Sequence, residues 1–241
     1  MPLQRLADRS YEHLEQSFNA LVFMFFALPA VKAREPRMRT HFNAVYPNVK
    51  KARGNYDQRV VKAAEFAEWA SKEDRTPMLQ LALVNACSAY ENALKQISVA
   101  IALGYKPKET KSHGKTVFLG SNELLAAHKQ ARQNWHVASS STDFLRQHVY
   151  LPNVLPANVN LPLLDDGSSD VQTVESAFLV RNDCVHNMGR SSKQIELCDS
   201  AQVIGHPVVL TPKTLFDVSK SMLRMIEPFN PQDRAWNAWG I

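Results

Sequence analysis

The strongest constraint on the fold of this chain is a long stretch of uninterrupted helical periodicity near its middle. Apolar side chains recur there every three or four positions, as they do along one face of an α-helix. They are Leu79, Leu83, Ala86, Tyr90, Leu94, Ile97 and Ile101. Thr76 and Pro77 suit the start of a helix, and Gly104 suits its end. We therefore predict a helix over about 76–103, the clearest one in the chain.

The same periodicity predicts helices along most of the remaining sequence. They cover about 14–28, 56–71, 121–135, 143–150, 171–188 and 212–229. Asp170 is the predicted N-cap of the helix that carries residues 171–188, and Gly189 is its predicted end. Thr211-Pro212 is a typical opening for the last helix. The fold class is therefore all-α. Three short apolar stretches allow a minor β-hairpin or an extended loop, at 195–197, 202–204 and 208–210.

Composition describes an ordinary globular chain and favours an anionic partner slightly. The chain has 241 residues, of which 45% are hydrophobic and 21% are charged, so it is not of the disordered type. Its formal net charge of +5 suits nucleic acid, although many proteins without such a partner share it. The basic loop over 106–115 has two interpretations. We favour a solvated connection, and a phosphate-contacting loop is the alternative. Its residues are Lys106, Lys108, Lys111, His113, Gly114 and Lys115.

We predict a cytoplasmic protein with no membrane partner. The apolar stretch over 20–31 is well short of the roughly 20 residues that span a bilayer. Charged residues precede it, so it is not a signal peptide. We interpret it as the buried part of a core helix, with a subunit contact as the alternative. Three cysteines are an odd number and are expected to be reduced, namely Cys87, Cys184 and Cys198.

Several catalytic and cofactor motifs are missing from the sequence. Eight glycines in total assemble neither a phosphate-binding loop nor a dinucleotide fingerprint. The eight histidines never reach metal-ligand spacing, and Asp165-Asp166 is typical of a solvated turn. No serine occupies a nucleophile elbow. We therefore expect no cofactor and no metal site.

The helix predicted over 171–188 carries an unusual set of polar residues. At about 100° per residue, Arg181 projects into the middle of an apolar arc. Asn182 and His186, one turn apart, lie along the flank of that arc, and Asp183 points to its far side. The arc consists of Val174, Ala177, Phe178, Cys184, Val185 and Met188. Because Cys184 points to the apolar side, we do not expect a thiol nucleophile.

An arginine in an apolar arc is costly unless its charge is paired, hydrated or shared with a ligand. Its stem can extend to the surface and keep the charged group in water. It can pair with a carboxylate on a neighbouring helix, for which Glu91 is the first candidate. Or it can face a polar cleft in which a phosphate takes the place of the carboxylate. The last two arrangements are compatible, since a carboxylate can orient an arginine that still presents one edge to a ligand.

The order Arg181-Asn182-(three residues)-His186 resembles the signature of the HEPN superfamily (higher eukaryotes and prokaryotes nucleotide-binding). That signature is Arg, four to six residues and His, often with Asn after the Arg. The long helix with Tyr90-Glu91-Asn92 resembles the earlier helix that packs against the motif. The resemblance covers about 76–104 and 171–229. It implies a single HEPN-like helical domain over 1–241, extended by N-terminal helices in 1–72 and an insertion at 106–170.

The resemblance implies a metal-independent endoribonuclease that acts as a homodimer, often as a toxin or defence effector restrained by an antitoxin or other regulatory protein. The substrate would be single-stranded RNA and the product a 2′,3′-cyclic phosphate. His186 would act as general base or acid, Arg181 would stabilise the phosphorane and Asn182 would orient His186 or the phosphate. Glu91 would support Arg181. The alternative is a non-catalytic HEPN-like module that binds a nucleotide or a protein.

Overall fold

A computed structural model describes residue 3 and residues 5–19, 76–105, 116–150, 167–229 of the chain. The predicted helix at 56–71, the apolar stretch at 20–31, the basic loop at 106–115 and Asp165-Asp166 lie outside these ranges. None of the helices within the ranges has both the length and the apolar character that a membrane crossing needs.

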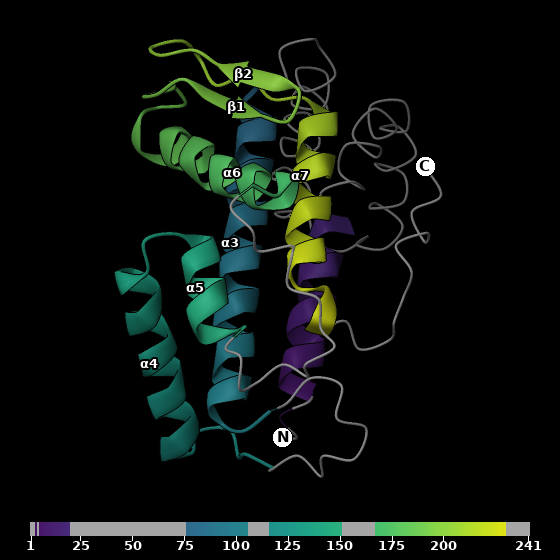
Figure 1. Cartoon of the computed structure of the whole chain (residues 1–241), viewed down its shortest axis with the longest axis vertical. Coiled ribbons are helices and arrows are strands. Elements are labelled where there is room, and N and C mark those ends of the chain that lie inside the picture. The colour runs from purple at the N-terminus through teal and green to yellow at the C-terminus, as the bar shows by residue number, and fades with distance from the viewer. Residues whose placement is uncertain (1–2, 4, 20–75, 106–115, 151–166, 230–241) are drawn as a thin grey trace, which may run out of the picture.

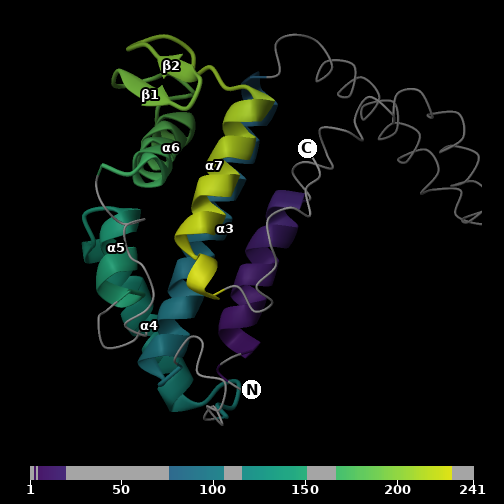
Figure 2. The ribbon, with the colours of Figure 1, turned by 45° about the vertical axis from the view of Figure 1, so that its right-hand side comes forward.

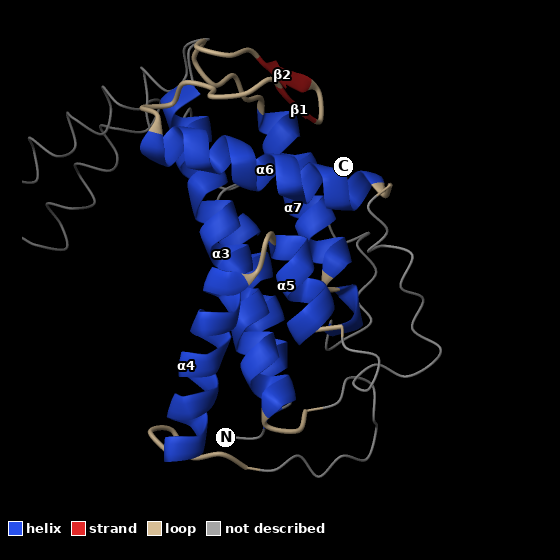
Figure 3. Cartoon of the chain, turned by 60° about the vertical axis from the view of Figure 1, so that its left-hand side comes forward, coloured by secondary structure: helices blue, strands red, loops and turns tan. Residues whose placement is uncertain are grey.

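The described part of the chain is mostly helical, with one small two-stranded sheet (Figures 1 and 3), as the all-α prediction requires. The first helix covers residues 5–19. The later elements are α3 (Thr76–Ala102), α4 (Asn122–Val137), α5 (Ser141–His148), α6 (Ser169–His186), β1 (Ile195–Leu197), β2 (Ser200–Gln202), α7 (Pro212–Met225) and the 3-10 helix η2 (Glu227–Phe229).

Helix α3 is the central element, and its predicted apolar stripe faces the core. Every member of the stripe is buried except Ile101, which is half-buried. The helix ends one residue before the predicted end, at Ala102. Gly104 adopts the left-handed conformation with φ of 100°, and its N–H bonds the Ile101 carbonyl at 2.8 Å. The Tyr105 N–H bonds the Ala100 carbonyl at 2.9 Å. This Schellman motif confirms the prediction that Gly104 ends the helix.

The other helices surround α3 and share one hydrophobic core with it. The first helix and α7 run along α3, while α4 and α5 pack beside it (Figures 1 and 2). Helix α6 lies across α3 and α7 near one end of the molecule, with the hairpin beyond it. The core joins Leu14 and Phe18 of the first helix to Leu83 of α3 and Met222 of α7. Helix α6 joins the same core through Val174, Ala177 and Val180.

The hairpin differs from its prediction in the position of the second strand. Strand β2 begins two residues before the predicted strand at 202–204, because Cys198 and Asp199 form a two-residue turn. Cys198 takes a positive φ of 53° there, which its residue type does not signal. The stretch at 208–210 forms no strand: the Gln202 amide instead bonds the Val209 N–H at 2.9 Å and its carbonyl at 2.7 Å.

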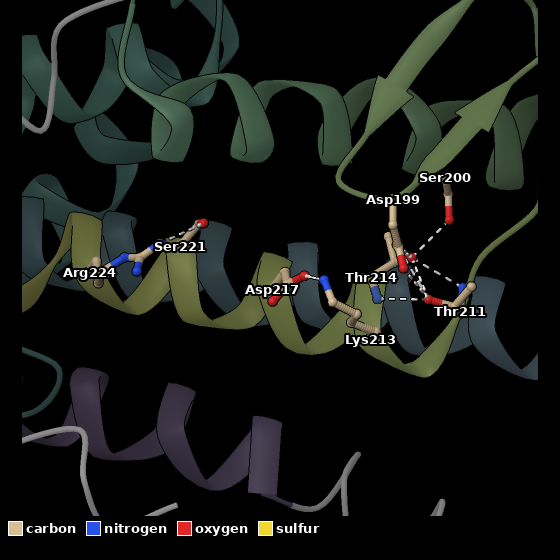
Figure 4. Close-up of polar contacts among 8 residues, drawn as sticks. All are labelled: Asp199, Ser200, Thr211, Lys213, Thr214, Asp217, Ser221 and Arg224. Carbon is tan, nitrogen blue, oxygen red and sulfur yellow. Dashed lines mark hydrogen bonds and ion pairs between the residues drawn. The ribbon is translucent and has the colours of Figure 1, made fainter. Parts of the chain in front are cut away.

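Helix α7 begins as predicted at Thr211-Pro212. The Thr211 hydroxyl accepts the Thr214 N–H at 3.0 Å, and the Thr214 hydroxyl accepts the Thr211 N–H at 3.2 Å. Asp199 in the hairpin turn accepts a further bond from the Thr214 hydroxyl at 2.7 Å (Figure 4). The reciprocal capping stabilises the start of α7, and the bond to Asp199 ties the hairpin to it. The predicted inward residues are all buried, namely Leu215, Val218, Met222, Met225 and Phe229.

The prediction that Asp170 caps α6 is wrong. Ser168 is the N-cap, and its hydroxyl accepts the Val171 N–H at 3.2 Å. Asp170 lies in the first turn instead and is buried. Its carboxylate accepts bonds from the Ser221 hydroxyl at 2.7 Å and from the Arg224 guanidinium. Asp170 therefore links the start of α6 to α7, a role that depends on partners about 50 residues away and that local sequence does not reveal.

Candidate functional site

The three candidate catalytic residues all lie in the last two turns of α6. Arg181 is half-buried, whereas Asn182 and His186 are exposed. His186 is the last helical residue, and the Asn187 N–H caps the helix by bonding the Asp183 carbonyl at 3.0 Å. The site therefore lies at the carboxyl end of α6, next to the loop that leads into the hairpin.

Arg181 pairs with Glu91 of α3, which confirms the predicted partner. The Arg181 Nη2 lies 3.9 Å from the Glu91 Oε2, which is an ion-pair distance and is too long for a hydrogen bond. The side chains are 25% and 21% exposed, so water reaches both. Nη1 donates to the Asn182 Oδ1 at 3.1 Å, and Nε has no hydrogen-bond partner within the described ranges. Within the described ranges the guanidinium thus makes one hydrogen bond and one long ion pair.

Lys95 completes the charged group around Glu91, and sequence reasoning missed it. Its ammonium donates to the Glu91 Oε1 from one turn further along α3. The same nitrogen lies 5.1 Å from the centre of the Trp135 ring on α4. The spacing of Glu91 and Lys95 is that of a helical ion pair and was available in the sequence. The contact with Trp135 was not, because it depends on how α4 packs.

His186 and Arg181 do not face each other within one chain. The imidazole has no hydrogen-bond or ion-pair partner among the residues that the structure describes. Five positions separate the two residues, so their side chains leave the helix about 140° apart. Asn182 lies only about 40° from His186 by the same geometry. The structure thus brings Arg181 and Asn182 together and leaves His186 on the exposed side.

The predicted apolar arc of α6 is only partly correct. Val174 and Ala177 are buried, but Val185 is 48% exposed and Met188 is 97% exposed. The arc assumed a helix that continues to residue 188, whereas α6 ends at His186 and Met188 has a positive φ of 53°. The exposed residues define what we call the outer stripe of α6, made of Leu179, Asn182, Val185 and His186.

Asp183 is a buried carboxylate that accepts several hydrogen bonds. It points away from the apolar arc as predicted, but the loop that follows α6 covers it and leaves it 2% exposed. Its carboxylate accepts the Ser192 N–H at 3.1 Å, the Ser192 hydroxyl at 2.6 Å, the Asn187 amide at 2.7 Å and the Ser191 hydroxyl at 3.4 Å. Burial alone would raise the pKa of Asp183, but these bonds outweigh it and hold the pKa below its usual value. The carboxylate thereby fixes the loop beside His186.

The thiol beside the motif is protonated at neutral pH. Burial raises the pKa of Cys184 to about 11, with a further contribution from the charge of Asp183. Since only the thiolate is a good nucleophile, Cys184 does not suit nucleophilic catalysis. All three cysteines are free. Among the described residues, no three His, Cys, Asp or Glu side chains gather as a metal-binding group.

No protein-family model, curated protein sequence or solved structure matches the chain. The resemblance to the HEPN superfamily therefore remains a prediction from the motif at Arg181, Asn182 and His186. The geometry adds three facts to that motif. Arg181 makes one hydrogen bond and one long ion pair within the described ranges, His186 is exposed, and Asp183, which accepts several hydrogen bonds, lies between them in the sequence.

Proposed function

We propose that the chain is a metal-independent endoribonuclease of the HEPN type, which cleaves single-stranded RNA to 2′,3′-cyclic phosphate ends. One observation carries the proposal: a partly exposed guanidinium, 3.9 Å from its carboxylate partner, and an exposed imidazole occur at the end of the same helix. Arginine binds two oxygens of one phosphate in a bidentate contact, and histidine transfers protons near neutral pH. Cleavage of RNA without a metal requires both abilities.

The reaction would be an in-line displacement at phosphorus. One imidazole takes the proton of the ribose 2′-hydroxyl, the 2′-oxygen attacks phosphorus, and the bond from phosphorus to the 5′-oxygen breaks. The leaving 5′-oxygen takes a proton from a second acid. Arg181 stabilises the negative charge that grows on the phosphorane oxygens, while Asn182 holds the guanidinium in place through the bond at 3.1 Å. A single His186 cannot be base and acid in the same displacement.

A second copy of the chain would supply the second imidazole. The outer stripe of α6 suits such a contact, because it places the exposed apolar residues Leu179 and Val185 beside His186. Residues 179, 182 and 186 are three and four positions apart, which is the spacing of the contact residues in helices that pack side by side. We therefore propose that the protein is a homodimer, and the proposal places it in the cytoplasm. A role as a toxin or defence effector, restrained by an antitoxin or other regulatory protein, belongs to the same proposal.

The test is cleavage of labelled single-stranded RNA by the purified protein in the presence of EDTA. We expect cutting with cyclic phosphate ends, and a loss of roughly 100-fold or more in His186→Ala and in Arg181→Ala. His206→Ala is the matched control, since His206 is also exposed but lies in the loop beyond the hairpin. Cutting that EDTA abolishes, or full activity in His186→Ala, would contradict the proposal.

The divergence of about 140° between Arg181 and His186 favours one alternative function. A non-catalytic module that binds a nucleotide or protein needs the cation but not a convergent imidazole. Growth of cells on induction separates the two functions. Toxicity that His186→Ala relieves supports the ribonuclease, whereas harmless overexpression supports the binding module.

A further inference from the structure

Glu91 is shared unequally between two cations. The Lys95 ammonium donates directly to its Oε1, while the Arg181 Nη2 lies 3.9 Å from its Oε2. Charge-assisted hydrogen bonds are about 2.7–2.9 Å long, so Glu91 is bound to Lys95 and only faces Arg181. One carboxylate between two cations leaves this group with a net charge of +1. A carboxylate and a phosphate compete for the same donors of an arginine.

The position of Lys95 is set by packing as well as by charge. Its side chain is 20% exposed, and its ammonium lies 5.1 Å from the centre of the Trp135 ring. Trp135 in turn packs against Phe144 at 5.1 Å and Phe178 at 6.0 Å between ring centres. The ammonium is therefore held over an aromatic face, unlike that of an ordinary surface lysine. One oxygen of Glu91 is therefore bonded to a lysine that also packs on Trp135, and the other oxygen lies 3.9 Å from Arg181.

We propose that Lys95 is a positioning residue of a phosphodiester-binding site at Arg181. By binding Glu91, it prevents that carboxylate from closing onto the guanidinium and occupying the donors that an RNA phosphate would use. Without Lys95, Glu91 would form a bidentate pair with Arg181, and the net charge of the group would fall to zero. The inference rests on the proposed function only in that Arg181 binds the phosphate of RNA.

Binding of a 2′-O-methyl RNA oligonucleotide, which cannot be cut by attack of the 2′-oxygen, tests the inference by fluorescence anisotropy. We expect Lys95→Met to raise the Kd about tenfold, which is the loss of one near charge at a partly hydrated site. The double variant Lys95→Met with Glu91→Gln should restore the Kd to within about twofold of wild type, because Arg181 is then unopposed. Lys95→Arg, which keeps the charge, should bind as wild type does.

Lys213→Met is the matched control. Lys213 pairs with Asp217 at the same helical spacing on α7 (Figure 4), with 68% of the lysine side chain exposed. Lys213→Met removes one positive charge from the same kind of ion pair as Lys95→Met does, so its Kd reports the long-range effect of net charge alone. We expect its Kd to stay within about twofold of wild type. Thermal melting of each variant verifies that the fold is intact.

Two outcomes would overturn the inference. If Lys95→Met binds as tightly as wild type, the Lys95–Glu91 pair is a surface ion pair without influence on Arg181. If the double variant binds as weakly as Lys95→Met, Lys95 contacts the RNA itself and does not act through Glu91. RNA cutting by the wild type decides the proposed function separately. If the Kd values follow the predicted pattern but the protein does not cut RNA, the phosphate-binding site stands and the ribonuclease function is contradicted.

Discussion

Two charged residues of α6, Asp183 and Arg181, lie two positions apart and have opposite surroundings. Asp183 is 2% exposed, and its carboxylate accepts hydrogen bonds from Asn187, Ser191 and Ser192. Arg181 faces a carboxylate at 3.9 Å, donates one hydrogen bond to its neighbour, and has a buried Nε without a partner in the described ranges. The fold satisfies one charge and leaves the other partly open.

This difference separates a structural charge from a candidate binding charge. A buried polar group without a partner costs about 1–3 kcal/mol, and the Nε of Arg181 is such a group within the described ranges, so Arg181 contributes less to stability than a fully bonded charge does. Asp183 instead completes the turn after α6 and stabilises the folded state. We therefore expect substitution of Asp183, on the loop side of α6, to change stability, and substitutions at Arg181 and on the outer stripe to change RNA cutting.

The largest expected effect is a loss of RNA cutting when the outer stripe is substituted. The double variant Leu179→Glu with Val185→Glu places four carboxylates at a symmetric contact, which should separate the proposed dimer. Cutting should fall roughly 100- to 10,000-fold, because each site then lacks its second imidazole. Light scattering and an RNA cleavage assay measure the two changes. Val203→Glu with Ile204→Glu is the control, since both residues are exposed on the hairpin loop. Full cutting by a monomeric variant would contradict a shared site.

The next largest effect is a lower free energy of unfolding when Asp183, on the loop side of α6, is substituted. Asp183→Ala leaves the donors of Ser192 and Asn187 without an acceptor, and we expect it to lower the free energy of unfolding by about 3 kcal/mol. Asn182→Ala, the adjacent exposed residue, should change it by less than about 0.5 kcal/mol. Urea unfolding monitored by circular dichroism gives both values. Similar values for the two variants would remove the distinction between the sides of α6.

A smaller effect is the acid sensitivity that Asp183 confers. Its pKa is held below the usual value by hydrogen bonds, so the folded state binds its proton less readily than the unfolded state does. The stability that it contributes is complete above the unfolded pKa of about 3.9 and is lost as pH falls through the lower folded pKa. In urea unfolding between pH 7 and pH 3, Asp183→Asn should lose less stability than wild type. Parallel curves would assign the acid sensitivity to other carboxyl groups.

The sequence predicted the elements whose causes are local. The stripe from Leu79 to Ile97 and the glycine at position 104 placed α3 to within one residue, since both act within a few positions of the chain. Thr211-Pro212 placed the start of α7 for the same reason. The pairing of Arg181 with Glu91 was among the predicted arrangements, because a charge in an apolar arc is costly unless it is paired, hydrated or shared with a ligand.

Features that depend on distant partners were not predictable. Asp170 resembles a cap in sequence, but Ser168 takes that role while Asp170 bonds Ser221 of α7. The acceptor role of Asp183 depends on a loop that turns back at Met188 through a positive φ, which this residue type rarely adopts. Lys95 was visible as a helical ion pair, yet its position over the Trp135 ring requires the packing of α4 on α3.

The smallest expected effect is on the Arg181–Glu91 pair, and it measures how open that pair is. Full burial would make loss of either partner cost roughly 3–5 kcal/mol. Because both side chains are about a quarter to a fifth exposed and the closest atoms are 3.9 Å apart, solvent screens the pair. We expect Arg181→Met or Glu91→Leu alone to cost about 1 kcal/mol, and the double variant to cost no more than either. A coupling energy above about 3 kcal/mol in urea unfolding would show a closed pair with no donors left for phosphate, and Arg181 would then belong with Asp183 as a structural charge.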